Sequence, residues 1–314
     1  MKVAIIGQQD FGKAVLEAFL ARGDEVVGVF TAPEKEGARP DSLRVVAQEK
    51  GLTLFQLPSL TGEAAREALG SLRADIGVMA YVRQFAPQEF VTIPTHGTIQ
   101  YHPSLLPRYR GPSSISWPIV CGETQTGLTV FRPHDGLDEG PVILQKSIPI
   151  MPDDTLGSVY FDQLFPLGVH ALLEAADLVV AGRHAEVVQN ESMASYEGQF
   201  GVAESRINWN NHINFVYNLI RGCDPAPGAW TMLNGKKLHF FETRKHLFQT
   251  FGSVKGKVGT ISEIGEKSIR VTAQGGQIEA FTVRGGGRQK DVRCRVCASR
   301  GFTCRSKAWR VILG

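Results

Sequence analysis

The sequence predicts an α/β fold with a mostly parallel sheet covered by helices, followed by a small β-domain. In the first third of the chain, short β-branched runs alternate with helical patterns, which is typical of βαβ units. After a polar stretch at residues 186–204, short strands separated by glycine predominate, which is typical of a small β-barrel-like domain. The length of 314 residues also favours two domains, at roughly 100–200 residues per domain.

The elements of the first domain follow one another in βαβ order. Strands are expected at residues 3–6, 25–31, 52–55, 75–80, 98–101, 127–131 and 142–148. Helices are expected at residues 12–21 and 62–69, with a long amphipathic helix within 156–180. We place this domain at residues 1–190 and a linker at residues 191–205.

The second domain has a different pattern of predicted elements and is placed at residues 206–284. One helix is expected at residues 210–220, followed by strands at 238–242, 256–261, 268–272 and 277–283. The last residues, 285–314, form an atypical basic tail that contains cysteines.

Composition excludes several classes of protein. Apolar residues make up 43% of the chain and charged residues 21%, as in an ordinary soluble globular protein. No apolar run approaches the ~20 residues that a membrane-spanning helix needs. The chain opens on a buried-strand pattern, Lys2–Gly7, in place of a signal peptide. We therefore expect a cytoplasmic protein with no membrane partner.

Charge is distributed unevenly along the chain. The formal net charge is +3, but residues 284–314 hold nine of the 34 Lys and Arg residues and one acid, Asp291. The rest of the chain is mildly acidic, which argues against broad nonspecific binding of nucleic acid, although the tail has the charge to contact phosphates.

Three of the five cysteines, Cys294, Cys297 and Cys304, lie in the tail. The first two have C-x-x-C spacing, but a closed structural zinc site needs four ligands and no fourth follows. Cys121 and Cys223 are isolated. We therefore expect neither a metal site nor a disulfide framework.

Gly7 and Gly12 lie between a strand and a helix, as in a phosphate-binding loop. However, Ala14 stands where that motif needs a hydroxyl group for magnesium. Gln9 stands where the dinucleotide-binding motif needs its second glycine. We interpret the two glycines as a tight turn at the start of a helix.

The segment with the clearest chemical content is residues 100–111, just beyond the carboxyl end of a predicted strand. Open α/β sheets bind ligands at that edge. Two prolines within five residues of His102 stiffen the loop, although a lone loop histidine is more often structural than catalytic. If the acidic loop at residues 135–141 reaches the same place, Asp138 would orient the imidazole and relay a proton. Otherwise Asp138 belongs to a simple acidic turn.

Motifs in both halves of the chain point to one family. In the first half they are His102-Pro103-Ser104-Leu105-Leu106-Pro107-Arg108, Gly127-Leu128-Thr129-Val130 and Gly136-Leu137-Asp138-Glu139-Gly140. In the second half they are Arg206-Ile207-Asn208-Trp209, Ile220-Arg221-Gly222 and Pro227-Gly228-Ala229-Trp230-Thr231. Over about residues 1–283, the chain resembles the folate-dependent formyltransferases, which include methionyl-tRNA formyltransferase and the hydrolase domain of 10-formyltetrahydrofolate dehydrogenase.

This resemblance implies a Rossmann-like domain followed by an OB-like domain. It also implies transfer of a formyl group from 10-formyltetrahydrofolate through a tetrahedral intermediate, without a metal. His102 would stabilise the oxyanion and help to transfer the proton, and Asp138 would position His102 and share in that transfer. The third place of the family's triad holds Gln100 where an Asn is usual. Gln keeps the amide donor but displaces it by about 1 Å, which in an organised site slows the reaction.

The resemblance also assigns folate and substrate contacts. The pterin would be held by Val82, Arg83, Gln84 and Phe85, and by Pro133, His134, Asp135 and Gly136. The substrate loop would be Ser104, Leu105, Leu106, Pro107 and Arg108. For Phe85, simple packing in the core is an equally good interpretation.

Three formyl acceptors remain open: water, the amine of methionyl-tRNA, and the amine of a small metabolite or sugar. Tyr101, residues 84–87 and residues 195–198 resemble the hydrolase branch, and the short loop at 33–40 lacks the basic insert of the tRNA enzymes. A further alternative is a folate-binding or regulatory protein that has lost turnover through Gln100. The tail retains Ala298-Ser299-Arg300-Gly301 but otherwise departs from the family, which suggests a local change of reading frame or a sequencing error.

Overall fold

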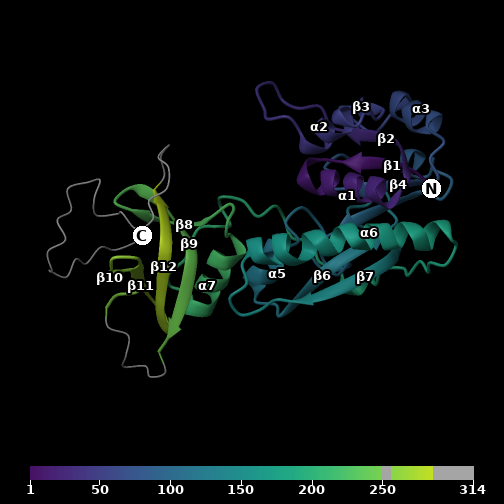
Figure 1. The fold of residues 1–314 in the computed structure, drawn as a ribbon. Coiled ribbons are helices and arrows are strands. Elements are labelled where there is room, and N and C mark those ends of the chain that lie inside the picture. Colours follow the sequence, from purple (N-terminus) through teal and green to yellow (C-terminus); the bar gives the residue numbers. More distant parts are fainter. Residues whose placement is uncertain (249–255, 286–314) are drawn as a thin grey trace. The chain divides into compact units, whose positions relative to one another are not determined.

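The computed structural model describes residues 1–248 and 256–285, and the chain forms two compact units (Figure 1). The first unit comprises Met1–Ser114, Thr126–Ile148 and Phe161–Glu197. The second comprises Ile115–Gln125, Pro149–Tyr160 and the described residues from Gly198 onward. The cysteine-containing tail, with Cys294, Cys297 and Cys304, lies outside the described residues.

The first unit is built on a seven-stranded sheet with the order β3-β2-β1-β4-β5-β6-β7. Neighbours from β3 to β5 are parallel, and β6 pairs antiparallel with β5, so the expected mostly parallel sheet is confirmed. The strands are β1 (Lys2–Gly7), β2 (Glu25–Thr31), β3 (Leu54–Gln56), β4 (Ile76–Ala80), β5 (Thr98–His102), β6 (Gln125–Phe131) and β7 (Val142–Pro149).

Helices cover both faces of this sheet, as parallel strands with apolar residues on both sides require. On one face, Ala4, Ile6 and Phe30 pack with residues of two helices, α3 and α4. On the other face, the Phe11 ring of α1 lies 4.5 Å from the Tyr101 ring of β5. The helices are α1 (Gln9–Arg22), α2 (Ser42–Glu49), α3 (Glu63–Ser71), α4 (Gln88–Val91) and α6 (Phe165–Val180).

Strand order places the candidate site. The chain runs outward from β1 to β3 and then returns to the other side of β1 with β4 and β5. Loops that leave the carboxyl ends of strands around such a reversal form the usual ligand-binding edge of an open α/β sheet. Residues 81–87 follow β4 and residues 103–111 follow β5, so both predicted loops leave from this edge.

The glycine turn after β1 is structural. A Cβ atom at Gly7 would lie 2.2 Å from the backbone oxygen of Ala80, so only glycine allows β1 and β4 to approach here. Gln9 has a positive φ of 58°, and its backbone N–H donates to Oδ2 of Asp41 at 2.8 Å. The Asp41 carboxylate therefore accepts a hydrogen bond from the backbone of this turn, in agreement with a structural role for the turn.

The second unit contains a small antiparallel sheet of five strands, in the order β10-β11-β12-β9-β8. The expected small β-domain is therefore present, and β8 is a strand that the sequence pattern did not indicate. The elements are α5 (Ser116–Cys121), α7 (Ile213–Gly222), β8 (Ala229–Leu233), β9 (Lys236–Leu247), β10 (Ile261–Ile264), β11 (Ile269–Ala273) and β12 (Gly276–Gly285).

Two segments that precede the second domain in sequence, residues 115–125 and 149–160, belong to this second unit. The segment at 149–160 is bonded to α7. Arg221 of α7 donates from Nη1 to the backbone oxygen of Asp154 at 3.0 Å, and the Tyr217 hydroxyl donates to Oδ1 of Asp153 at 2.9 Å. Burial, together with the Asp153 carboxylate, raises the pKa of Tyr217 above its usual value, so this hydroxyl stays protonated and remains a donor.

One helical stretch, Ser158–Val180, is long and apolar enough to cross a membrane by length and composition. It comprises a π-helical turn, Ser158–Leu164, and α6. Ala171, Leu172 and Ala175 of α6 are fully buried, and Gly168 faces the Tyr101 ring of β5. These buried residues of α6 thus belong to the core of the first unit. A core helix of a protein meets the same criteria of length and composition as a membrane-spanning helix.

The close approach at Gly7 generates a stability prediction. Gly7→Ala should lower the free energy of unfolding by about 1–3 kcal/mol, because the methyl group collides with rigid backbone. Gly70→Ala, in α3 with nothing within 4 Å, is the matched control and should raise stability by about 0.5–1 kcal/mol. Urea unfolding followed by circular dichroism measures both, and equal effects would contradict the assignment.

Candidate active site

His102 is the last residue of β5, and its direction follows from strand alternation. Tyr101 points toward α1 and α6, where its ring meets Phe11 and Gly168. Successive side chains of a strand point to opposite faces, so Gln100 and His102 share the other face. The structure therefore brings these two residues of the expected triad to one side of the sheet, with His102 buried and Gln100 partly buried.

The hydrogen bonds of His102 determine which of its ring nitrogens carries a proton. Nε2 lies 2.9 Å from the backbone oxygen of Tyr109, and a carbonyl oxygen only accepts hydrogen bonds. This bond therefore places a proton on Nε2. The other ring nitrogen, Nδ1, lies 3.4 Å from Oδ2 of Asp138.

Asp138 reaches this position from the loop between β6 and β7. Its backbone has a positive φ of 51°, a conformation that Asp tolerates better than most residues. Oδ2 also accepts a hydrogen bond of 2.8 Å from the backbone N–H of Gly111. The side chain is 8% exposed, so His102 and Asp138 form a buried pair.

The loop that follows His102 is held from below by Thr129 of β6. Thr129 Oγ1 donates to the backbone oxygen of Ser104 at 2.7 Å and accepts from the backbone N–H of Leu106 at 3.1 Å. Gln145 of β7 adds a bond of 2.7 Å to the backbone oxygen of Leu106. Of the predicted substrate loop, Ser104 and Leu106 thus point inward, whereas Leu105 and Pro107 are partly exposed and Arg108 is exposed.

The two segments assigned to the pterin lie next to each other. Gln88 joins them: its side-chain amide donates to the backbone oxygen of Pro133 at 2.8 Å, and its backbone N–H donates to Oδ1 of Asp135 at 3.2 Å. Sequence reasoning missed Gln88, because only its contacts in the fold mark it. Of the expected residues, Arg83, Phe85, His134 and Asp135 are exposed, Val82, Gln84 and Gly136 are partly exposed, and Pro133 is buried.

Phe85 is 53% exposed, so packing in the core does not account for it. Tyr81 and Leu137 are exposed apolar side chains on the same two loops, at 44% and 58%. Val82 instead packs partly against the apolar cluster beneath α3 and α4, and the Gln84 amide donates to the backbone oxygen of Leu57 at 2.8 Å. Some residues of these loops are thus fixed to the body of the first unit, and others present apolar side chains to solvent.

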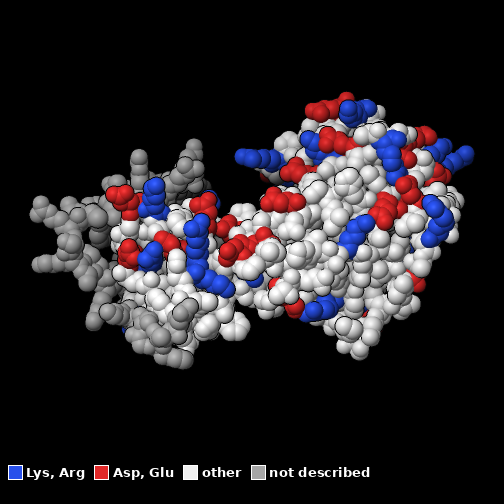
Figure 2. Space-filling model, turned by 60° about the horizontal axis from the view of Figure 1, so that its bottom comes forward, with Lys and Arg blue, Asp and Glu red and all other residues white. Residues whose placement is uncertain are grey.

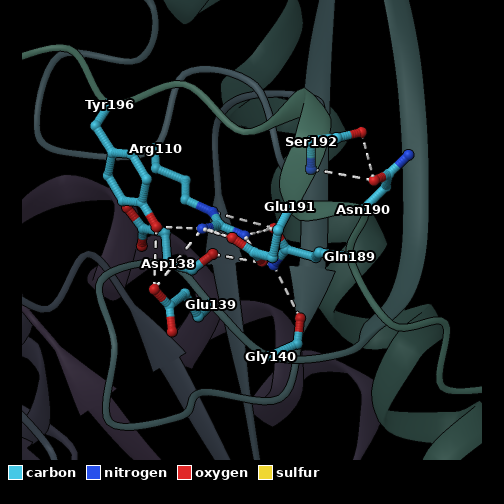
Figure 3. A network of polar contacts seen from close by, with 9 residues as sticks. All are labelled: Arg110, Asp138, Glu139, Gly140, Gln189, Asn190, Glu191, Ser192 and Tyr196. Atoms are coloured by element: carbon cyan, nitrogen blue, oxygen red, sulfur yellow. Dashed lines mark hydrogen bonds and ion pairs between the residues drawn. The ribbon is translucent and has the colours of Figure 1, made fainter.

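A second polar cluster is centred on Arg110 and reaches the turn that carries Asp138 (Figure 3). The Arg110 side chain is completely buried, and Nη2 and Nη1 donate to the two Glu191 carboxylate oxygens at 2.6 and 3.0 Å. Nη1 also donates to the Tyr196 hydroxyl, which in turn donates to Oε1 of Glu139 at 3.0 Å. Residues 191–197, expected within a linker, are part of the first unit.

The charges in this cluster stabilise each other. Hydrogen bonding to Glu191 raises the pKa of Arg110 above its usual value, and Arg110 holds the pKa of Glu191 below the ordinary range. Such two-point pairing of a guanidinium with a carboxylate is the arrangement that lets an arginine be buried in its charged state.

Among residues 1–248 and 256–285, no group of three or more His, Cys, Asp or Glu side chains is arranged to hold a metal ion.

Comparison with known proteins decides the family. Residues 1–175 match the family described as "Formyl transferase", and residues 201–291 match "Formyl transferase, C-terminal domain". The chain belongs to the formyl transferase family.

Two curated relatives illustrate what this chain is similar to. Mitochondrial 10-formyltetrahydrofolate dehydrogenase of Homo sapiens is 39% identical over 246 residues, which is 77% of this chain and 26% of that protein. Methionyl-tRNA formyltransferase of Syntrophus aciditrophicus is 32% identical over 283 residues, which is 88% of this chain and 89% of that protein. The chain therefore spans about a quarter of the length of the dehydrogenase.

Solved structures share the fold of this chain. WlaRD, a sugar 3N-formyl transferase, superposes with a TM-score of 0.69 at 18% identity, over 90% of this chain and 97% of that one. HypX from Aquifex aeolicus, in complex with tetrahydrofolic acid, superposes with a TM-score of 0.64 at 18% identity, over 91% of this chain and 44% of that one. At this level of identity the likeness concerns the fold.

The bond between His102 and Tyr109 predicts a ring tautomer. In the neutral state, His102 should carry its proton on Nε2, because only a donor fits opposite the Tyr109 carbonyl. Long-range ¹H–¹⁵N correlation spectra at alkaline pH report the tautomer, with His102→Gln used to assign the resonance among the eight histidines. A neutral ring protonated on Nδ1 would contradict the geometry.

Proposed function

We propose that this chain transfers the formyl group of 10-formyltetrahydrofolate to a nucleophile through the pair His102 and Asp138. The observation that carries the proposal is the pairing itself: a buried imidazole and carboxylate, 3.4 Å apart, at the carboxyl edge of the sheet. Relatives named for 10-formyltetrahydrofolate support the choice of the donor.

The proposed reaction begins when the nucleophile attacks the formyl carbon and forms a tetrahedral intermediate whose oxygen carries negative charge. Asp138 takes the proton that the nucleophile loses and passes it to Nδ1 of His102, 3.4 Å away. His102 delivers this proton to N10 as the carbon–N10 bond breaks, which restores both groups to their starting states. Nδ1 has this role because Nε2 is bonded to the Tyr109 carbonyl. The Gln100 amide, on the same face, is the candidate donor to the intermediate's oxygen.

The two loops joined by Gln88 are the proposed pterin site. Phe85 on the first loop and Leu137 on the second loop both offer exposed apolar side chains. A flat pterin needs apolar side chains on its faces and polar backbone groups at its edge, which residues 82–85 and 133–136 provide. The exposed part of the 104–108 loop, Leu105, Pro107 and Arg108, would then border the folate or acceptor.

Water is the first candidate acceptor, which makes formate and tetrahydrofolate the products. The dehydrogenase relatives are the more similar in sequence over the aligned residues, at 39% against 32% identity. On the face drawn in Figure 2, basic and acidic side chains are interspersed over the described residues, without the continuous basic surface that favours RNA. The amine of methionyl-tRNA is the second candidate, because that relative aligns with 88% of this chain.

The assay that tests the proposal incubates the protein with 10-formyltetrahydrofolate and follows tetrahydrofolate by absorbance, with and without an amine acceptor. Release without an acceptor supports hydrolysis, and release only with methionyl-tRNA or an amino sugar identifies that amine as the acceptor. Folate binding without any release would contradict the enzymatic proposal and favour a regulatory protein.

His102→Gln and Asp138→Asn should each slow turnover at least about 100-fold, because each removes a group that holds or moves a proton in the transition state. Steady-state kinetics of tetrahydrofolate release measures the loss. His170→Gln, on α6, is the matched control and should retain the wild-type rate. Full activity in either site variant would contradict the assigned mechanism.

Gln100→Leu should slow turnover by about 100-fold, since loss of one donor to the developing oxyanion has effects of that size. Gln100→Asn should retain most activity, because it keeps the amide and restores the residue usual in the family. The same assay separates the two variants. Equal rates for the Leu variant and the wild type would show that the Gln100 amide takes no part.

A further inference from the structure

Gln189 contacts the turn that carries Asp138, and its amide is fully engaged (Figure 3). Nε2 donates to the backbone oxygens of Asp138 and Gly140 at 3.0 and 2.8 Å. Oε1 accepts from Nη2 and Nε of Arg110 at 2.8 and 3.2 Å. The side chain is 8% exposed, so water does not readily replace these four bonds.

The orientation of this amide follows from Arg110. A guanidinium only donates hydrogen bonds, so Gln189 must turn its oxygen toward Arg110 and its NH₂ group toward the two carbonyl groups. Arg110 is itself held by the paired Glu191 carboxylate. The position of the Asp138 backbone is thus connected, through Gln189, to the buried guanidinium of Arg110.

The backbone around Arg110 contacts the other side of the pair. Tyr109 accepts the hydrogen bond from His102, and Gly111 donates to Asp138. Ser195 holds this strip: its hydroxyl accepts from the Tyr109 N–H at 2.9 Å, and its backbone oxygen accepts from the Arg110 N–H at 3.0 Å. Residues 189–196 therefore hydrogen-bond to the backbone segments that contact His102 and Asp138.

We propose that Gln189 and Arg110 are positioning residues that hold the Asp138 carboxylate opposite Nδ1 of His102. The proposal rests on the proposed function, because it concerns the same pair. Gln189 donates to the backbone oxygen of Asp138 and not to its carboxylate, and Arg110 is linked to the pair through Gln189 and through the backbone of the 109–111 strip. A misplacement of about 1 Å in such a pair slows a reaction by about 100-fold.

Gln189→Glu is the sharpest test, because it keeps an acceptor for Arg110 and replaces the donor to the two carbonyl groups with a second acceptor. We expect kcat to fall by about 10- to 100-fold, with KM for 10-formyltetrahydrofolate changed less than about threefold. Arg110→Lys, which keeps the charge but loses the two-point geometry, should move kcat in the same direction. Ser192→Ala is the matched control, because Ser192 contacts Asn190 and not the turn.

A double-mutant cycle with Asp138→Asn separates positioning from general loss of structure. If Gln189 acts through Asp138, then Gln189→Glu should change the residual rate of Asp138→Asn by less than about threefold. The same loss factor in both backgrounds, or full activity of Gln189→Glu in the wild-type background, would overturn the inference. Unchanged turnover in Asp138→Asn itself would instead refute the proposed function.

A measurement on the resting protein tests the inference without turnover. At a fixed pH, the ¹⁵N resonance of His102 Nδ1 in Gln189→Glu should move toward its position in Asp138→Asn, and Ser192→Ala should leave it in place. Thermal unfolding shows whether each variant is folded at the temperature of the spectrum. A folded Gln189→Glu protein with the wild-type Nδ1 resonance would overturn the inference whatever its activity.

Discussion

The burial of the Arg110 guanidinium is the constraint on which the geometry of the site depends. The Arg110 side chain is fully buried although Glu191 is 65% exposed, and a buried charge needs hydrogen-bond partners, which Glu191 and the Gln189 side-chain oxygen supply. Because the backbone neighbours of Arg110 bond to His102 and Asp138, the ion pair and the candidate active site share one set of supports.

Sheet register determines how the same residues come together. β6 runs antiparallel to β5 with Thr129 opposite His102, so the chain leaves β6 at the end opposite the His102 loop. The 132–141 loop must therefore fold back along the sheet to bring Asp138 to His102. The positive φ of Asp138 and the two bonds from Gln189 belong to this return. The polar contacts that support the site are thus a consequence of the antiparallel pairing between β6 and β5.

Much of the fold could be predicted, because many elements carry strong local signals. The β-branched run at 25–31 predicts β2 with its observed bounds. α2 was missed although Asp41 caps it, with its side chain accepting from the Leu43 N–H. The packing of residues 115–125 and 149–160 with the second unit had no local signal, since it depends on contacts such as Arg221 with Asp154, far away in sequence. Periodicity reports which face of an element is apolar and not which neighbour covers it.

By itself, the sequence determined the order and type of most elements, the family, and the identity of His102, Asp138 and Gln100 as candidates, because these are properties of adjacent residues and motifs. Only the tertiary structure decided that His102 and Asp138 meet, that Nε2 holds its proton against Tyr109, that Phe85 faces solvent, and that Gln189 supports the turn. Each of these depends on a hydrogen bond or on burial between segments distant in the chain. Such contacts exist only once the sheet has fixed the register of its strands.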